Sequence, residues 1–442
     1  MRGFRAAIAH VLFLAARLVG RFHEREIARP VSSRIAVALF TSAIRVDPGI
    51  DGACYLRLGI LHARMGRAVA SEEALRRGVD RYSDNPWLRF HLAHSLLGQQ
   101  RYRDAMDAFR EAIALEPTEA IFWLDLEFAV RQAGAAADHL VHSRGLADRF
   151  SDSVLAQRHL GSTLDMLDRF DESASAYRFA SRAQFRAARP ELGGESDATG
   201  PTALLIGPSR CGKSTLYKHL LSHPRVAPAL YEEMNYWVDS REPPIDWYRS
   251  QLPPTGDSSE IVTVHTGTPY LHHREAAGRL WAACPEVKVI IVLRDPVVRA
   301  YAHYFQGRSL GKTLEPWPRL VDEWLGAHGD LSTDEIGELG DHGFLGGGVY
   351  LPGVARWSET IAPEQLLIVQ SEQLFERPDA TLVEVCDFLG IAPVAPAAPP
   401  SSGLHRHDTS MPAETRRDLY RFYRPHNLAL EARLGRRFDW QE

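Results

Sequence analysis

The stretch Gly207-Pro-Ser-Arg-Cys-Gly-Lys-Ser-Thr215 is the strongest indication of fold in this 442-residue chain. It follows an apolar run at Ala203–Ile206 and precedes leucines at helical spacing in residues 216–221. A strand, a glycine-rich turn and a helix start, in this order, form a phosphate-binding loop, because the backbone N–H groups and the helix dipole converge on an anion. Lys213 adds a positive charge and Ser214 a hydroxyl. We expect a site for a phosphorylated donor here.

A second informative stretch lies further along the chain, at Val289–Pro296. The apolar part of this stretch predicts a buried strand that ends in Arg294, at the carboxyl edge of the sheet where ligands bind in such folds. Pro296 is well placed to begin the next helix. The planar guanidinium of Arg294 suits a second phosphate, and a structural ion pair is the alternative interpretation.

Short β-like runs alternate with helical stretches from residue 202 onward, which predicts a parallel sheet covered by helices. We expect a three-layer α/β domain of P-loop type in residues 202–442. The glycines at 346–348 and the proline-rich residues 392–403 are predicted to be mobile loops. The predicted strands are Ala203–Ile206, Ile261–Val264, Val287–Leu293 and Leu366–Gln370, and the predicted helices are 213–222, 272–283, 296–306, 378–389 and 413–423.

Residues 30 to 185 repeat with a 34-residue period, which predicts an α-solenoid of four or five helical hairpins in residues 1–188. Small or aromatic residues recur where paired helices cross, except that His139 and Ser143 make the third unit degenerate. Residues 189–201, rich in Gly, Pro and small polar residues, are predicted to be a linker. The most regular steps are Leu58-Gly59, Leu92-Ala93, Leu126-Glu127 and Leu160-Gly161.

This periodicity resembles the tetratricopeptide repeat, most closely in residues 86 to 117. The resemblance implies a concave surface that docks a protein partner or a polymer. A rigid spacer and an oligomerisation element are the alternatives.

The composition is that of a soluble globular protein, with 45% hydrophobic residues, 24% charged residues and a net charge of −5. This balance gives no reason to expect a nucleic-acid partner. The four cysteines show no metal-ligand spacing, and no other cluster predicts a metal site. Free thiols favour a reducing compartment, so we expect a cytoplasmic protein. Only four of the 51 basic residues are lysines, which is typical of a GC-rich bacterial genome.

The N-terminal apolar run Ala6–Ala16 is flanked by arginines. It is shorter than the roughly 20 apolar residues that span a bilayer, so no transmembrane segment is predicted. We expect a helix that caps the repeats. A helix lying on a membrane surface, which would make the protein peripheral at the membrane, and a weak signal sequence are the alternatives.

The C-terminal half also resembles a family, the sulfotransferases that use 3′-phosphoadenosine 5′-phosphosulfate (PAPS), of the bacterial and heparan-sulfate type. The resemblance covers most of residues 202–442 and implies transfer of a sulfuryl group from PAPS to a hydroxyl or amine, for which a carbohydrate is the expected acceptor. The pieces that carry it are the phosphate loop, His223-Pro224, Asp246–Pro253, Thr268-Pro269-Tyr270, Leu293–Pro296 with Arg299-Ala300-Tyr301, Gly348-Val349-Tyr350, Glu364–Leu367, Ser371-Glu372, Phe388-Leu389-Gly390 and Met411–Thr415.

The resemblance also implies roles for single residues. Arg210 falls on the basic residue of the loop that neutralises the leaving group, and Arg294 on the arginine that holds the 3′-phosphate. Glu233 falls on the general base of the heparan-sulfate relatives. Ala302 stands where a serine normally joins Arg294, and Glu232 and Asn235 replace a lysine and a histidine beside the base. The expected donor-binding residues are Gly207, Arg210, Cys211, Gly212, Lys213, Ser214, Thr215, Arg294 and, from a C-terminal loop, Arg406; the expected catalytic residues are Glu233, Arg210 and Lys213.

Two other functions fit parts of the sequence. The loop satisfies the Gly-x-x-x-x-Gly-Lys-Ser pattern of ATP- and GTP-binding proteins, with Asp295 as the nearest candidate for holding magnesium. A P-loop kinase or NTPase is therefore the first alternative. The substituted positions around Glu233 and Ala302 motivate the second, a non-catalytic scaffold in which the repeats bind a partner beside a degenerate sulfotransferase domain.

Overall fold

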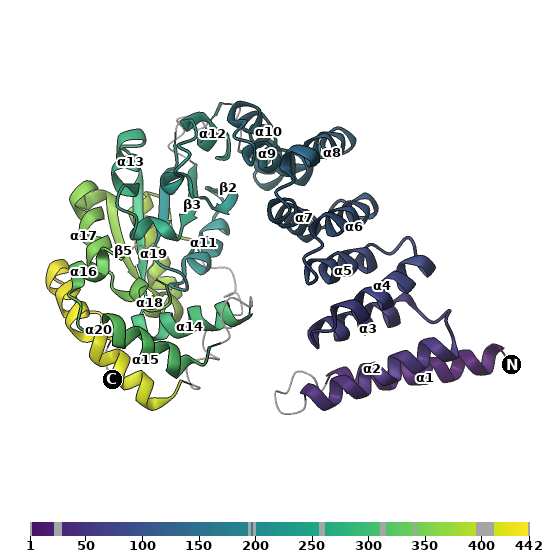
Figure 1. Ribbon diagram of the computed structural model, residues 1–442. Coiled ribbons are helices and arrows are strands. Elements are labelled where there is room, and N and C mark those ends of the chain that lie inside the picture. Colours follow the sequence, from purple (N-terminus) through teal and green to yellow (C-terminus); the bar gives the residue numbers. More distant parts are fainter. Residues whose placement is uncertain are drawn as a thin grey trace. The chain divides into compact units, whose positions relative to one another are not determined.

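The computed structural model describes residues 2–21, 29–192, 196–197, 200–255, 261–309, 315–339, 343–394 and 411–440. Two compact units divide the chain, Met1–Ala176 and Tyr177–Glu442. The first is a stack of helices and the second contains a parallel sheet (Figure 1). The predicted order of an α-solenoid followed by an α/β domain is confirmed.

The first unit consists of helical hairpins stacked side by side (Figure 1). Helix α10 continues across the border into the second unit. The helices are α1 (Arg2–Arg21), α2 (Arg29–Val46), α3 (Gly52–Arg64), α4 (Ala68–Arg81), α5 (Pro86–Leu97), α6 (Tyr102–Leu115), α7 (Ala120–Gln132), α8 (Ala136–Arg149), α9 (Val154–Asp165) and α10 (Phe170–Ala188).

Small residues allow the two helices of a hairpin to cross closely. A Cβ atom on Gly59 in α3 would lie only 2.4 Å from Cγ of Leu75 in α4. The hydroxyl of Ser71 donates to the carbonyl oxygen of Gly59 at 2.9 Å. Ser173 donates to Gly161 in the same way, also at 2.9 Å, in a later hairpin. The same hydroxyl-to-carbonyl contact therefore recurs at a multiple of the 34-residue period.

In the hairpin formed by α7 and α8, which is the degenerate repeat, a buried histidine pair between α8 and α9 replaces this hydroxyl contact. His139 Nε2 lies 2.8 Å from His159 Nε2, and a guanidinium nitrogen of Arg110 lies 2.8 Å from His139 Nδ1. Burial lowers the pKa of both imidazoles below the usual value, and the neighbouring positive charges lower it further. A bulky polar side chain is accommodated at this crossing because its neighbour hydrogen-bonds it.

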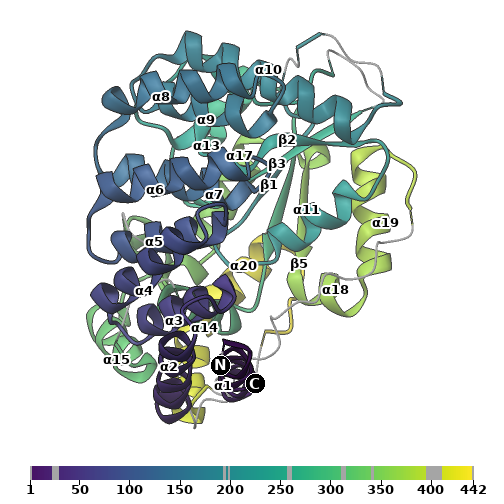
Figure 2. The same ribbon diagram turned by 90° about the vertical axis from the view of Figure 1, so that its right-hand side faces the viewer.

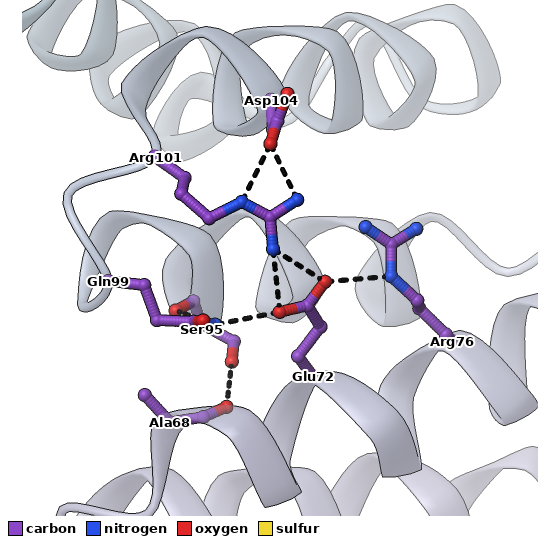
Figure 3. Close-up of polar contacts among 7 residues, drawn as sticks. All are labelled: Ala68, Glu72, Arg76, Ser95, Gln99, Arg101 and Asp104. Carbon is purple, nitrogen blue, oxygen red and sulfur yellow. Dashed lines mark hydrogen bonds and ion pairs between the residues drawn. The ribbon is translucent and has the colours of Figure 1, made fainter.

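An ion-pair network joins the second and third hairpins (Figure 3). Glu72 in α4 accepts hydrogen bonds from Arg76, from Gln99 and, through both carboxylate oxygens, from Arg101. Arg101 in turn binds Asp104 at the start of α6. Burial alone would raise the pKa of Glu72, but these hydrogen bonds hold it below its ordinary value.

The second unit is built on a five-stranded sheet with the order β2-β3-β1-β4-β5, in which every pair is parallel. The central strands are buried on both faces, as the residues of β1 show. Helices α11 and α19 lie on one side of the sheet, and α13 and α17 lie on the other (Figure 2). The strands are β1 (Ala203–Ile206), β2 (Val226–Glu233), β3 (Val262–Gly267), β4 (Lys288–Leu293) and β5 (Leu366–Gln370).

The helices of this unit vary more in length than those of the solenoid. They are α11 (Lys213–Leu221), α12 (Ile245–Arg249), α13 (Ala276–Ala283), α14 (Pro296–Ser309), α15 (Trp317–His328), α16 (Thr333–Gly337), α17 (Leu351–Thr360), α18 (Ser371–Glu376), α19 (Pro378–Leu389) and α20 (Ala413–Leu434).

Some predicted elements differ from the structure. Strand β2 was not expected, because Pro228 and the glutamates at its end hide it from a search for apolar runs. The glycines Gly346–Gly348 form a buried 3₁₀ turn instead of a mobile loop. In the predicted linker, Arg189 donates to the carbonyl oxygens of Leu221, His223 and Val226. The remaining loop prediction, residues 392–403, lies almost entirely outside the described residues.

Candidate active site

The loop 207–212 lies where the order of the strands reverses. From β1 the chain proceeds to β2 and β3 on one side, whereas β4 and β5 follow on the other side. Strands β1 and β4 are neighbours, with Ile206 in register with Ile291. In open α/β sheets the crevice at such a switch point, beyond the carboxyl ends of the strands, is where ligands bind. Arg294 follows β4 directly and therefore lies beside the loop.

The backbone of this loop requires glycine at its first position. Gly207 has φ +138°, and a Cβ atom there would meet the carbonyl oxygen of Val292 at 2.3 Å. Gly212, at the start of α11, has φ +96°. Arg210 adopts φ +71°, which is uncommon for a residue with a side chain. The conformation brings the loop against β4 and directs its last turn into the N-terminus of α11.

Lys213 is buried, and its ammonium binds back to the loop. Nζ donates to the carbonyl oxygens of Gly207 and Pro208, at 2.6 and 2.9 Å. Burial lowers the pKa of Lys213, an effect that Glu233 and Glu232 partly oppose. The lysine therefore closes the loop on itself and places a positive charge inside it.

Arg294 links the end of β4 to the loop. Its guanidinium donates to the carbonyl oxygen of Arg210 at 3.1 Å and lies 6.0 Å from the ring centre of Phe375 in α18. Tyr350 donates to the carbonyl oxygen of Arg294 at 2.7 Å, which fixes the backbone there. Burial and the charge of Arg294 lower the pKa of Arg210. Two arginines held this close together favour an anion between or beside them.

Three buried polar groups at the loop have no hydrogen-bond partner within the described part of the chain. They are Nε of Arg210, Oγ of Ser371 and Nε of Arg299, whose guanidinium donates to the carbonyl oxygen of Ser209. Ser371 Oγ would lie 3.0 Å from a Cβ atom on Gly212, and Phe375 borders the same glycine. Unpaired buried donors are costly unless a ligand satisfies them. These residues therefore fit a polar, negatively charged ligand.

The other residues predicted from the loop differ in accessibility. Cys211 is buried, and burial raises the pKa of its thiol, so it is a packing residue of the loop. Ser214 is exposed and Thr215 half-buried, both in the first turn of α11. Ala302 is buried in α14. Arg406 lies outside the described residues.

Glu233 ends β2 at the same edge of the sheet. Its carboxylate accepts a hydrogen bond from the backbone N–H of Thr268 at 3.1 Å, and its side chain is exposed. Tyr270, which follows Thr268, donates to the carbonyl oxygen of Met234. These contacts tie the end of β2, and with it the carboxylate of Glu233, to the loop after β3.

A cavity of about 620 Å³ opens beside the phosphate loop. It extends from Pro208 and Ser209 of the loop to Thr268 and Arg299. Arg299 is buried and binds the carbonyl oxygens of Ser209 and Phe344. The full lining is Pro208, Ser209, Thr268, Pro269, His272, His273, Arg274, Glu275, Arg299, His303, Gly337, Glu338, Leu339, Gly343 and Gly347.

Residues Arg299, Ser371 and Phe375 were not predicted as site residues. Arg299 and Ser371 stand inside stretches that carry the family resemblance, and this was the one signal available from the sequence. No sequence signal identified Phe375, because an aromatic residue in a short helix is usually part of the core.

Two family models match parts of this chain. Residues 201–398 match the sulfotransferase domain model, and residues 90–138 match a tetratricopeptide repeat model. Human heparan sulfate glucosamine 3-O-sulfotransferase 3B1 is 28% identical over 263 residues, covering 54% of this chain and 65% of that protein. Mouse bifunctional heparan sulfate N-deacetylase/N-sulfotransferase 4 is 27% identical over 267 residues, covering 53% of this chain and 30% of that protein.

Each match spans less than two thirds of these relatives' own length. Among solved structures, a sulfotransferase from Alicyclobacillus acidocaldarius is similar with a TM-score of 0.44 and 20% identity, over 55% of this chain and 98% of that one. Residues 201–398 are a sulfotransferase domain, and this chain joins it to tetratricopeptide repeats.

Proposed function

We propose that this protein transfers the sulfuryl group of PAPS to a hydroxyl or amine of a carbohydrate. The observation that carries the proposal is the contact between Arg294 and the carbonyl oxygen of Arg210. It joins two anion-binding elements, the loop after β1 and the arginine after β4, at the switch point of the sheet. A donor with a phosphosulfate at one end and a 3′-phosphate at the other requires two such elements side by side.

The donor would be held by the loop residues and by Arg294. The backbone of Gly207–Gly212 and the N-terminus of α11, with Ser214 and Thr215, suit the 5′-phosphosulfate. Arg294 suits the 3′-phosphate, and Phe375 provides a ring beside Gly212. Arg406 remains a proposed contact from the C-terminal part of the chain. PAPS supplies the activated sulfuryl group, and the family gives no requirement for a metal.

Catalysis would rest on positioning and on charge neutralisation, because sulfuryl transfer resembles phosphoryl transfer in needing little else from the protein. Arg210 would neutralise charge on the leaving group, with Lys213 holding the loop closed behind it. Glu233 would take the proton from the acceptor hydroxyl or amine. Its hydrogen bond with Thr268 holds the carboxylate at the rim of the cavity.

The cavity favours a polar acceptor with hydrogen-bonding groups. Three histidines and two arginines line it, against two glutamates, and Arg274 pairs with Glu338. Its volume of about 620 Å³ accommodates sugar units, and the two curated relatives named above carry heparan sulfate in their names. These points support a carbohydrate acceptor over a small apolar alcohol.

The kinase alternative is disfavoured by the position of Asp295. Its Oδ1 accepts the N–H groups of Val297 and Val298 at the start of α14, and its Oδ2 accepts the hydroxyl of Tyr420. Burial raises the pKa of this carboxyl. A carboxylate already used as a helix cap is a poor magnesium ligand.

We further propose a bacterial protein that resides in the cytoplasm and binds a protein partner through the repeats. The compartment is supported by four buried free thiols, Cys54, Cys211, Cys284 and Cys386. Within the described residues, none of the helices combines the length and the apolar composition needed to cross a membrane.

Calorimetric titration of the purified chain with 3′-phosphoadenosine 5′-phosphate (PAP), ATP with magnesium and GTP with magnesium tests the donor site. We expect binding of PAP alone. A preference for ATP or GTP would overturn the proposal in favour of a kinase, and binding of none would favour the scaffold. Transfer of radiolabelled sulfate from PAPS to N-acetylated and de-N-acetylated glucosamine polysaccharides then tests the acceptor class.

A further inference from the structure

The outermost helix of the solenoid is apolar on two faces. Phe13 and Ala16 of α1 are buried against the first hairpin's core. On the opposite face, Val11 is 65% exposed, Leu14 47% and Ile8 38%. Helix α1 therefore presents a stripe of apolar residues to its surroundings.

Such a stripe is unusual on a repeat helix, because the apolar side chains of a repeat stack are normally covered by the neighbouring repeat. Scattered exposed apolar residues need no explanation, but residues that share one face of one helix indicate a binding surface. We name this surface, formed by Ile8, Val11 and Leu14, the α1 outer face.

The charge of the first hairpin shows what would cover that face. Helices α1 and α2 contain seven arginines and no aspartate or glutamate. The whole chain has a net charge of −5, so everything outside these two helices sums to −12. Helices that combine an exposed apolar face with many basic and no acidic residues are typical of proteins that bind anionic membranes.

A second copy of the chain does not suit this face. Two copies docked through this face would bring together two pairs of helices that each contain seven arginines and no acidic residue to pair with them. The complementary surface must be negative and must accept aliphatic side chains. A bilayer with anionic headgroups offers both properties.

We propose that the α1 outer face docks the protein on an anionic lipid surface, with α1 lying parallel to the membrane. Ile8, Val11 and Leu14 enter the boundary between headgroups and acyl chains, while the arginines of the hairpin bind the lipid phosphates. A helix of this kind gives reversible attachment, which weakens as salt screens the charges. The attachment goes beyond sulfuryl transfer and does not depend on it.

Flotation of the full-length protein with lipid vesicles tests the proposal. Vesicles of phosphatidylcholine alone are compared with vesicles containing 30% phosphatidylglycerol, at about 0.1 M and about 1 M NaCl, where the Debye lengths are about 10 and 3 Å. We expect binding to the anionic vesicles at low salt and little binding in the other three conditions. No binding under any condition, or equal binding to both vesicle types, would overturn the proposal.

Variants then locate the surface. Val11→Glu with Leu14→Glu replaces two exposed side chains and leaves Phe13 and Ala16 in place. We expect partitioning to fall about 100-fold, because each buried aliphatic side chain is worth about tenfold. Val141→Glu is the matched control, since Val141 in α8 is 77% exposed and lies outside the basic hairpin. Full binding by the double variant would place the contact elsewhere.

Light scattering of the same proteins tests whether a second copy of the chain covers the α1 outer face. We expect the parent and the double variant to have the same mass in solution. A dimer that the double variant loses, without vesicle binding by the parent, would assign the α1 outer face to a second copy and overturn the proposal. Helical circular dichroism of each variant confirms that the solenoid is folded.

Discussion

The carboxylate of Glu233 accepts the backbone N–H of Thr268 at 3.1 Å and thereby joins the ends of β2 and β3. The two residues are 35 positions apart in the sequence. Thr268 itself lines the cavity beside the phosphate loop. The hydrogen bond therefore holds the proposed general base next to a residue of the cavity wall.

Replacement of Glu233 by Gln should abolish sulfuryl transfer and leave donor binding intact. The amide keeps the size of the side chain and can still accept the Thr268 N–H, but it is no longer a base. General-base catalysis contributes about 10²–10⁴-fold, so we expect kcat to fall by that factor while the PAP affinity stays within twofold. Glu232→Gln, at the neighbouring position, should remain active. Full activity of Glu233→Gln would reject its role.

Arg294 should discriminate ligands by their 3′-phosphate. In the parent protein PAP should bind more tightly than AMP, which lacks that group. In Arg294→Ala the advantage of PAP should vanish, because a buried charge-assisted pair is lost. Arg294→Lys should restore part of it, since a single ammonium cannot make the bidentate contact. Calorimetry gives the ratio of the two affinities directly, and an unchanged ratio in Arg294→Ala would contradict the assignment.

Lys213→Met should destabilise the loop. Methionine fills a similar volume but leaves the carbonyl oxygens of Gly207 and Pro208 without their donor. We expect the free energy of unfolding to fall by about 1–3 kcal/mol, and donor affinity to fall with it. Lys218→Met, an exposed change on the same helix, is the control and should alter neither. Urea unfolding with and without PAP measures both effects.

Gly207→Ala should be among the most damaging single substitutions in the second unit. The new Cβ would meet a main-chain oxygen at 2.3 Å, and φ of +138° is unfavourable for alanine. We expect a loss of about 3 kcal/mol or more in the free energy of unfolding. Gly435→Ala also lies at positive φ, but nothing surrounds it within 4 Å, so a loss of about 1 kcal/mol is expected there. Similar melting temperatures for the two variants would argue against the close approach.

Acid should weaken the solenoid at the His139–His159 pair. Burial holds the pKa of both imidazoles below the unfolded value of 6.5, so between pH 6.5 and the folded values the unfolded state binds more protons. Their contribution is complete above pH 6.5 and is lost as pH falls, by about 1.4 kcal/mol per pH unit for each histidine.

Hydrogen exchange of peptides from α8 and α9, at pH 7.5 and 5.5 and corrected for the intrinsic rate, measures this loss of stability. His159→Gln should reduce the difference between the two pH values. His94→Gln, at an exposed histidine in α5, should preserve it. If the loss of stability between pH 7.5 and 5.5 persists in a variant that lacks both buried histidines, another titrating group must cause it.

The features that could be predicted are those set by residues close together in the chain. The 34-residue period, the strands at Ala203–Ile206 and Leu366–Gln370 and the helix after Lys213 were predicted within a residue or two, because hydrophobic spacing over a few turns sets them. Strand β2 was missed because its pairing with β3 compensates for a proline and a polar end. The buried turn Gly346–Gly348 was missed because Arg299 and Tyr423 pack against it.

The order of the two folds, the phosphate loop and the arginine after the apolar strand could be predicted from the amino-acid sequence, because these features depend on residues close together in the chain. Four contacts could be seen only in the folded protein: Lys213 binds its own loop, Arg294 contacts Arg210, Thr268 donates to Glu233, and Asp295 caps a helix. Each of these contacts depends on strand order and on side-chain packing, where residues far apart in sequence compete for the same partners and burial selects among them.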